Sequence, residues 1–187
     1  MPQNPLSLED FRRWALGNLV DNRNRGLFAE WLVGMALDVI DKASERQEWD
    51  AYDLLYRDRK IEVKAAGRSQ SWNPNHSAPI RFGIEQKKTS WSAATDTFTH
   101  HDQPQRFADV YVFCLHTAVP ADNVNVADPD YWQFWVVRTS VLDGELGTQK
   151  SLGINRLDQI AEPVQWSDIR ATVDECLKET LVDGTGD

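Results

Sequence analysis

The chain has 187 residues, of which 41% are apolar and 26% are charged, enough to bury the core of one globular domain. Its two cysteines, Cys114 and Cys176, form no CxxC pair and predict neither a disulfide framework nor a cysteine-based zinc site. The net charge of −9 argues against a chain-wide basic surface for a polyanion.

The acidity belongs to the C-terminal part of the chain. Residues 1–110 contain 15 Lys and Arg against 16 Asp and Glu, whereas residues 111–187 contain 5 against 13. From Arg57 to Lys88 the balance reverses, with eight basic and three acidic residues. We therefore expect a local basic surface that is compatible with phosphates, and an acidic C-terminal part that faces a protein partner.

No segment suggests export or membrane insertion. The residues MPQNPLSLED lack the basic segment and apolar run of a signal peptide. The most apolar stretch, Leu27 to Ile40, is interrupted by Glu30 and Asp38 and is too short and too charged to span a bilayer. We expect a cytoplasmic protein with no membrane partner and one domain over residues 1–187, frayed at 183–187.

The N-terminal third predicts two helices followed by a hairpin. Ser7 before Leu-Glu-Asp predicts a capped helix to about Val20, which residues 22–26 break. A second helix, almost wholly apolar and therefore buried, is expected over residues 27–42. Strands are expected over 49–56 and 60–66, with a polar turn at 57–59.

The remaining elements follow a loop over residues 67–79. A third strand is expected from the alternation of residues 80–85, and no strand in the polar stretch that continues to about Arg106. Buried strands are expected over 108–118 and 131–140, and helices over 140–146 and 167–181, the last capped by Ser167. This order predicts an α/β (α+β) fold with a mixed central β-sheet flanked by helices.

Three ionisable residues stand out in the predicted hairpin. A two-residue turn at Arg57-Asp58 would pair residues whose numbers sum to 115, so that Asp53 lies opposite Glu62, with Lys64 on the same face. Two facing carboxylates repel each other, and a divalent cation between them would remove that repulsion. A three-residue turn would instead place Val63 opposite Asp53.

A third carboxylate lies in the predicted buried helix. Glu30 is flanked on both sides by apolar residues in LFAEWLVGMAL. A buried carboxylate needs a cation, a hydrogen-bonding partner or a raised pKa. Taken alone, Glu30 is equally compatible with a solvent-facing position on the helix.

The ordered set Glu30, Asp53, Glu62 and Lys64 resembles the PD-(D/E)xK nuclease superfamily over residues 27–66. The usual proline before the motif Asp is absent, because Tyr52 precedes Asp53. The resemblance implies a restriction-endonuclease-like core and a Mg²⁺-dependent deoxyribonuclease, an endonuclease that hydrolyses phosphodiester bonds of DNA.

The resemblance also assigns roles to these residues. Asp53, Glu62 and the backbone carbonyl of Val63 would hold Mg²⁺, for which Mn²⁺ can substitute, and Glu30 would complete the metal shell directly or through water. Lys64 would orient or deprotonate the attacking water and offset charge on the phosphate. Gln86, on the expected third strand, resembles an accessory polar position of the family, although a strand Gln at a solvent-facing edge is the better interpretation.

Substrate contacts are less specific. Six basic residues are candidates for phosphate contacts or are simply surface charges: Arg57, Arg59, Lys60, Arg68, Lys87 and Lys88. Trp72 and Trp91 lie in polar stretches and either stack on bases or pack over the sheet. We interpret His76, His100 and His101 as loop residues without a metal role.

Two other functions stay open from the sequence. One is a catalytically silent nucleic-acid-binding or regulatory module of the same fold, although such a module would be expected to lose Lys64 or a carboxylate. The other is an acidic protein-interaction domain in which Asp53, Glu62 and Lys64 form a structural ion-pair cluster. A homodimer is compatible with a single catalytic domain that cuts both strands of a duplex.

Overall fold

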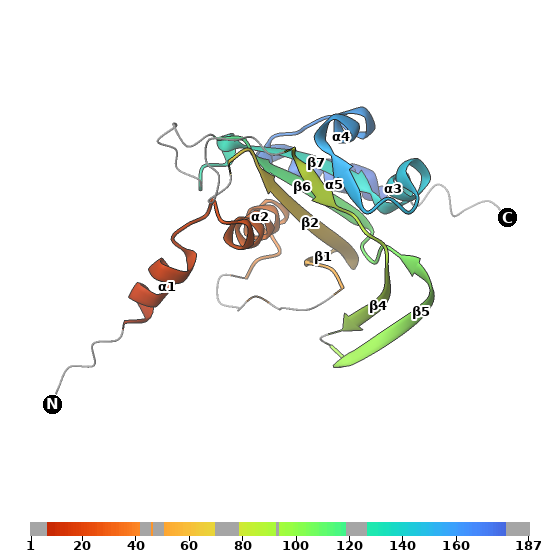
Figure 1. Ribbon diagram of the computed structural model, residues 1–187, viewed down its shortest axis with the longest axis horizontal. Coiled ribbons are helices and arrows are strands. Elements are labelled where there is room, and N and C mark those ends of the chain that lie inside the picture. The colour runs from red at the N-terminus through yellow and green to blue at the C-terminus, as the bar shows by residue number, and fades with distance from the viewer. Residues whose placement is uncertain are drawn as a thin grey trace.

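A computed structural model describes residues 7–41, 46, 51–69, 79–92, 94–118 and 127–178. At its centre is a four-stranded sheet of β1 (Leu54–Tyr56), β2 (Arg59–Gly67), β6 (Val110–His116) and β7 (Trp132–Arg138), in the order β1-β2-β6-β7 (Figure 1). β2 runs parallel to β6, and the other two pairs are antiparallel. The mixed central sheet predicted from the sequence is therefore confirmed.

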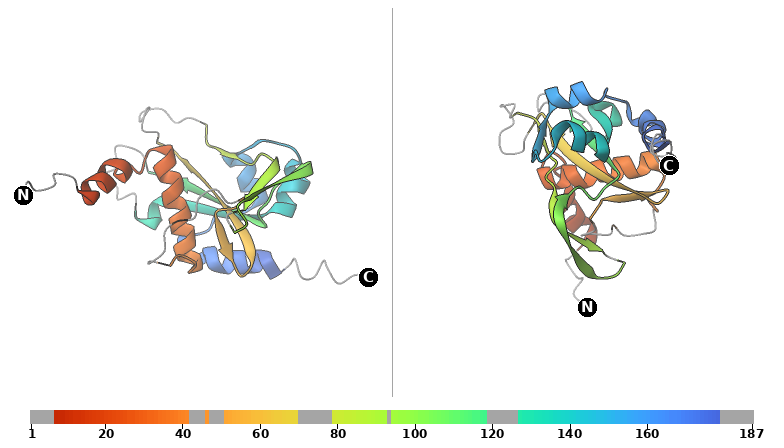
Figure 2. Two further views of the ribbon diagram at one scale, coloured as in Figure 1. Left: turned by 90° about the horizontal axis from the view of Figure 1, so that it is seen from below. Right: turned by 90° about the vertical axis from the view of Figure 1, so that its right-hand side faces the viewer.

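The two faces of this sheet are covered differently. Helices α2 (Asn22–Leu37) and α5 (Ile169–Lys178) pack on one face. The other face is covered by the short sheet of β3 (Arg81–Gly83) and β8 (Ser151–Gly153), and by α3 (Thr139–Leu146) and α4 (Ile154–Ile160) (Figures 1 and 2).

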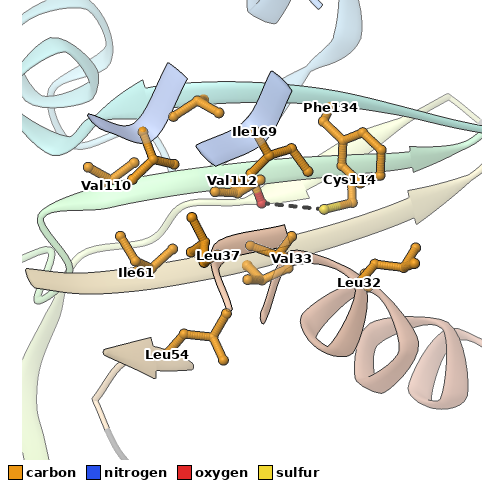
Figure 3. Packing of buried hydrophobic residues seen from close by; sticks show 14 of the residues in the cluster. Leu32, Val33, Leu37, Leu54, Ile61, Val110, Val112, Cys114, Phe134 and Ile169 are labelled. Carbon is orange, nitrogen blue, oxygen red and sulfur yellow. Dashed lines mark hydrogen bonds between the residues drawn. The ribbon is translucent and has the colours of Figure 1, made fainter. Parts of the chain in front are cut away.

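Strand alternation divides the core into two clusters. Val110, Val112 and Cys114 of β6 contact α2 and α5, whereas Phe113 and Leu115 belong to the cluster under α3 and α4. Figure 3 shows the first cluster, in which side chains of α2 and α5 meet those of β2 and β6. In β2, Ile61 and Val63 are in this first cluster, so Glu62 and Lys64 face the opposite side of the sheet.

The first two helices correct the predicted boundaries. Ser7 caps α1 (Leu8–Leu16), as predicted, by accepting a hydrogen bond from the Asp10 amide at 3.2 Å. The predicted break at residues 22–26 is wrong, because Asp21 accepts from the Arg23 amide at 3.0 Å and starts α2 there. α2 ends at Leu37, before Asp38 in the left-handed conformation.

A hairpin occupies the stretch that was predicted to contain no strand. β4 (Lys87–Ser92) and β5 (Thr97–Gln105) form their own two-stranded sheet. His100 and His101 therefore lie on a strand, and their interpretation as loop residues was wrong. Most of the side chains of this hairpin are exposed, so its sequence lacks the apolar alternation that reveals a half-buried strand.

Smaller differences concern short elements. β1 and β3 have three residues each, fewer than predicted, and α4 was not predicted. Ser167 lies inside the 3₁₀ turn Trp166–Asp168 rather than capping α5; a second 3₁₀ turn spans Pro129–Tyr131. Trp72, His76 and the tail at 183–187 lie outside the described residues.

Within the described ranges, no helix combines the length and the apolar character that crossing a membrane requires.

Candidate active site

The hairpin of β1 and β2 has a two-residue turn, the first of the two turn lengths left open by the sequence. Arg57 and Asp58 both have positive φ, 49° and 61°, which suits the twist of a tight hairpin. Leu54 pairs with Ile61, Leu55 with Lys60 and Tyr56 with Arg59. The predicted register, in which paired numbers sum to 115, is confirmed over these three pairs.

Asp53 leaves this register one residue before β1. Its backbone N–H donates to the carbonyl of Ile61 at 3.0 Å, so the ladder does not continue to the Asp53–Glu62 pair that we expected. Its carboxylate instead accepts a hydrogen bond from the backbone N–H of Val63 at 2.7 Å. The N–H and C=O of one strand residue point to the same side, so the Val63 carbonyl also faces the strand edge where Asp53 lies.

Glu62 and Lys64 form an ion pair on the sheet face opposite α2. Their side chains are 15% and 31% exposed, respectively. Burial raises the pKa of Glu62, and the negative charge of Asp53 raises it further, while Lys64 and Lys87 partly offset the shift. The structure thus brings Asp53, Glu62 and Lys64 near one another, although Asp53 is not the cross-strand partner of Glu62 that we expected.

Tyr111 is a member of this site that the sequence did not reveal. It lies on β6 directly beside Glu62 in the parallel register and is 5% exposed. Burial raises the pKa of its hydroxyl well above the usual value, and the charge of Glu62 adds to the shift. Tyr111 therefore stays protonated at neutral pH and is available as a hydrogen-bond donor.

These side chains border a pocket of about 220 Å³. Glu62, Lys64 and Tyr111 form its wall on the sheet side. The opposite rim consists of residues that follow β3 and residues at the base of the β4–β5 hairpin, among them Glu85, Lys87, Gln105 and Phe107. The pocket therefore joins the partly buried Glu62 carboxylate to cationic side chains that come from separate elements.

Arg106 is a structural part of the pocket wall. Its buried guanidinium donates to the carbonyls of Ile84 and Gly147 at 2.9 and 3.0 Å and forms an ion pair with Asp143. Gln86 was predicted to lie on the third strand, but it lies between β3 and β4. Its amide donates to the same Asp143 at 3.3 Å. Both residues hold the loop after β3 against α3.

Glu30 is 7% exposed, so of the two positions left open by the sequence it takes the buried one. Two nitrogens of Arg46 donate hydrogen bonds to the Glu30 carboxylate. Nε lies 2.8 and 3.0 Å from the two oxygens, and Nη2 lies 2.7 Å from Oε2. This bidentate pair supplies the cation that a buried carboxylate requires. α2 packs beneath Ile61 and Val63, whereas Glu62 and Lys64 point to the other face, so the pocket wall contains those two residues and not Glu30.

The six predicted phosphate-binding residues are spread over the surface. Lys87 lines the pocket, and Lys88 is exposed beside it on β4. Arg57 pairs with Asp174 of α5 at 2.8 Å and Arg59 lies 3.6 Å from Asp109, while Arg68 is exposed at the far end of β2. Lys60 lies over the ring of Tyr52, 5.5 Å from its centroid.

In the described ranges, no three side chains of His, Cys, Asp or Glu form a group that could hold a metal ion by themselves. Asp53 and Glu62 supply two carboxylates, and the Val63 carbonyl points to the same edge. No family model matches the chain, and a search of the curated proteins found no relative.

Proposed function

We propose that this chain has a restriction-endonuclease-like core and is a metal-dependent nuclease that hydrolyses phosphodiester bonds of DNA. The observation that supports this most directly is the site at the start of β2. Glu62 and Lys64 line the pocket as an ion pair, and partial burial together with the nearby Asp53 carboxylate raises the pKa of Glu62. Perturbed, clustered titratable groups at a pocket are characteristic of catalytic sites.

The oxygen atoms at this site suit a divalent cation. The repulsion between Asp53 and Glu62 that raises the pKa of Glu62 is relieved when a cation lies between them. Mg²⁺ is commonly bound through one or two carboxylates together with water. Asp53, Glu62 and the Val63 carbonyl would hold the ion, which when bound acidifies water and neutralises phosphate charge.

The remaining side chains of the pocket have complementary roles. Lys64 is the cation next to Glu62, and we assign it to the attacking water and the phosphate oxygens. The protonated hydroxyl of Tyr111 would donate to the phosphate, and Lys87 would bind it from the opposite rim. The bidentate pair with Arg46, together with its absence from the pocket wall, favours a structural role for Glu30 over direct metal binding.

The test is a cleavage assay on supercoiled, linear, single-stranded and branched DNA, each with Mg²⁺, Mn²⁺ or EDTA. The wild-type chain is compared with Lys64→Ala and with Lys178→Ala, an exposed lysine at the end of α5. We expect cleavage that requires metal, is lost in Lys64→Ala and is unchanged in Lys178→Ala.

Other results would identify the competing functions. Mg²⁺ binding by calorimetry without cleavage of any substrate would indicate a silent nucleic-acid-binding module of the same fold. Absence of both Mg²⁺ binding and cleavage would indicate a structural cluster in an acidic protein-interaction domain. Light scattering on the same samples would test whether the active species is a homodimer.

A further inference from the structure

The β4–β5 hairpin projects from the body of the protein as an arm (Figures 1 and 2). It forms a sheet of its own, separate from the central sheet. At its base Lys87 pairs with Gln105, and both of these residues line the pocket. The arm therefore begins at the pocket rim and extends away from it.

The two faces of the arm differ in chemistry. Trp91 lies opposite Phe98, and Thr89 lies opposite His100. Side chains alternate along each strand, so these aromatic rings share one face, with Phe98 72% exposed. The other face presents hydroxyl groups, from Ser90, Ser92, Thr97 and Thr99.

His101 joins the two strands of the arm near its base and contacts the pocket lining. Its imidazole is hydrogen-bonded to the Ser90 hydroxyl at 3.0 Å and to the Gln105 amide at 2.9 Å. Its ring lies 4.9 Å from that of Phe107, which lines the pocket. The base of the arm, from which the aromatic face extends, therefore lies against the proposed active site.

The charges of the arm do not fit the groove of a duplex. The sequence contains no Lys or Arg from residue 89 to residue 105, and it contains Asp96 and Asp102 there. An element that follows the closely spaced phosphates of a duplex would require cations along its length. Cationic side chains are confined to the base, at Lys87 and Lys88, where a single phosphodiester would enter the pocket.

The strand edges also argue against another protein chain as the ligand. Lys87 and Lys88 on β4 and Pro104 on β5 are residues that protect exposed edges from pairing with a further strand. An exposed aromatic face, in contrast, suits the planar faces of unpaired bases, whose stacking does not depend on sequence.

We propose, building on the nuclease function above, that the aromatic face of this arm binds unpaired bases of a DNA strand. Phe98 and Trp91 stack on the bases, while a phosphodiester of the same strand enters the pocket between Lys87 and Lys64. The preferred substrate is therefore single-stranded DNA, or the unpaired segment of a branched or frayed duplex.

The experiment measures binding without cleavage, in EDTA and in a Lys64→Ala background. Fluorescence anisotropy compares a labelled single strand with the blunt duplex of the same sequence. Phe98→Ala is expected to weaken single-strand binding about 5- to 100-fold, the range for loss of one base–aromatic contact. Thr97→Ala, on the hydroxyl face, is the matched control and is expected to change it less than about 2-fold.

Salt separates stacking from phosphate attraction. We expect the loss caused by Phe98→Ala to persist at raised salt, whereas the loss caused by Lys88→Ala should shrink. Circular dichroism checks that each variant is folded. If Phe98→Ala does not fold, His100→Ala removes another ring from the same face.

Unchanged single-strand binding in folded Phe98→Ala and His100→Ala would overturn the proposal, as would a wild-type preference for blunt duplex. Two further results distinguish it from the nuclease function. If single-strand binding depends on Phe98 but the wild-type chain cleaves no DNA with Mg²⁺ or Mn²⁺, the nuclease function is refuted and the binding role of the arm stands. Metal-dependent cleavage with the same KM in wild type and Phe98→Ala would refute the arm and leave the nuclease.

Discussion

The carboxylate of Asp53 accepts a hydrogen bond from the backbone N–H of Val63, at 2.7 Å. Asp53 thereby occupies the edge of β2 beyond the point where β1 begins, one strand position from Glu62. The Asp53 side chain thus accepts from a backbone donor and places a negative charge near the partly buried Glu62, whose ionised form it destabilises. Its structural and chemical roles can be separated by mutation.

Asp53→Asn should separate them. The Asn carbonyl can still accept from the Val63 amide, so we expect stability within about 0.5 kcal/mol of wild type. Asp53→Ala loses the hydrogen bond and should cost about 1–2 kcal/mol. Both substitutions remove a proposed metal ligand, and we expect both to abolish Mg²⁺ binding in calorimetry and cleavage of DNA. Mg²⁺-dependent cleavage by Asp53→Asn would show that Asp53 is only a structural residue.

Glu62→Gln should stabilise the protein while it inactivates the site. The pKa of Glu62 is raised in the folded chain, so its ionisation costs stability as the pH rises through that pKa. Lys64 is 31% exposed and can turn to water once its partner is neutral. We expect a gain of about 1 kcal/mol at pH 7, or about 2–4 °C in Tm, and little gain at pH 4.

The matched control is Glu85→Gln, an exposed carboxylate paired with Lys150 at 2.6 Å, which should shift Tm by less than about 1 °C. The structural ion-pair cluster predicts the opposite sign for Glu62→Gln. A lower Tm at pH 7, with activity unchanged, would therefore favour that alternative and contradict the proposed active site.

Local sequence patterns were sufficient for the part of the site that lies within one hairpin. Alternation around Ile61 and Val63, together with a two-residue turn, gave the orientation of Glu62 and Lys64 and the register of three pairs. The position of Asp53 differed because its backbone bonds to Ile61 one residue out of register, a shift that leaves no mark in the pattern of apolar residues.

Other features depended on contacts that are distant in the sequence. Tyr111 reaches Glu62 only because β2 and β6 are parallel neighbours, and nothing in either strand alone specifies that pairing. Arg46 lies in a polar stretch with no periodic relation to Glu30. The strands of the β4–β5 arm were not predicted. Because the arm is exposed, its sequence lacks the alternation of apolar and polar residues that marks a strand packed on a core.

Arg46→Gln should destabilise the fold more than is usual for a partly exposed side chain. The Arg46 side chain is 38% exposed. The substitution leaves the Glu30 carboxylate, whose side chain is 9% exposed, without its bidentate cation. We expect a loss of about 3 kcal/mol in the free energy of unfolding by urea. Arg13→Gln, which breaks the exposed pair with Asp10 on α1, should cost less than about 1 kcal/mol.

A double-mutant cycle then tests Glu30 itself. If its charge matters mainly through Arg46, the double variant Glu30→Gln, Arg46→Gln should recover part of the stability that Arg46→Gln loses. If Glu30 instead binds the metal, Mg²⁺ should restore stability to Arg46→Gln alone. If stability recovers neither in the double variant nor with Mg²⁺, Arg46 stabilises the fold through contacts other than Glu30.

His116 predicts a loss of stability in mildly acidic solution. It is 2% exposed at the end of β6, its ring lies 5.1 Å from that of Trp132, and neither ring nitrogen has a hydrogen-bond partner among the described residues. Burial lowers its pKa to about 4, and the positive charge of Arg25 contributes to the shift. The folded chain therefore requires the neutral imidazole.

The sign of the effect follows from a folded pKa below the unfolded value. The contribution of neutral His116 is complete above about pH 6.5 and is lost as the pH falls towards 4, by about 3 kcal/mol in total. His116→Phe keeps the ring packing with Trp132 and removes the titration. His100→Phe, on the exposed arm, is the control that keeps the buried imidazole.

Urea unfolding between pH 4 and 7 measures the difference directly. Buried carboxylates titrate in both chains and cancel when His116→Phe is compared with wild type. We expect His116→Phe to lose less stability than wild type on acidification, while His100→Phe follows the wild-type curve. Parallel curves for wild type and His116→Phe would show that His116 is protonated without opening the core between β6 and α2.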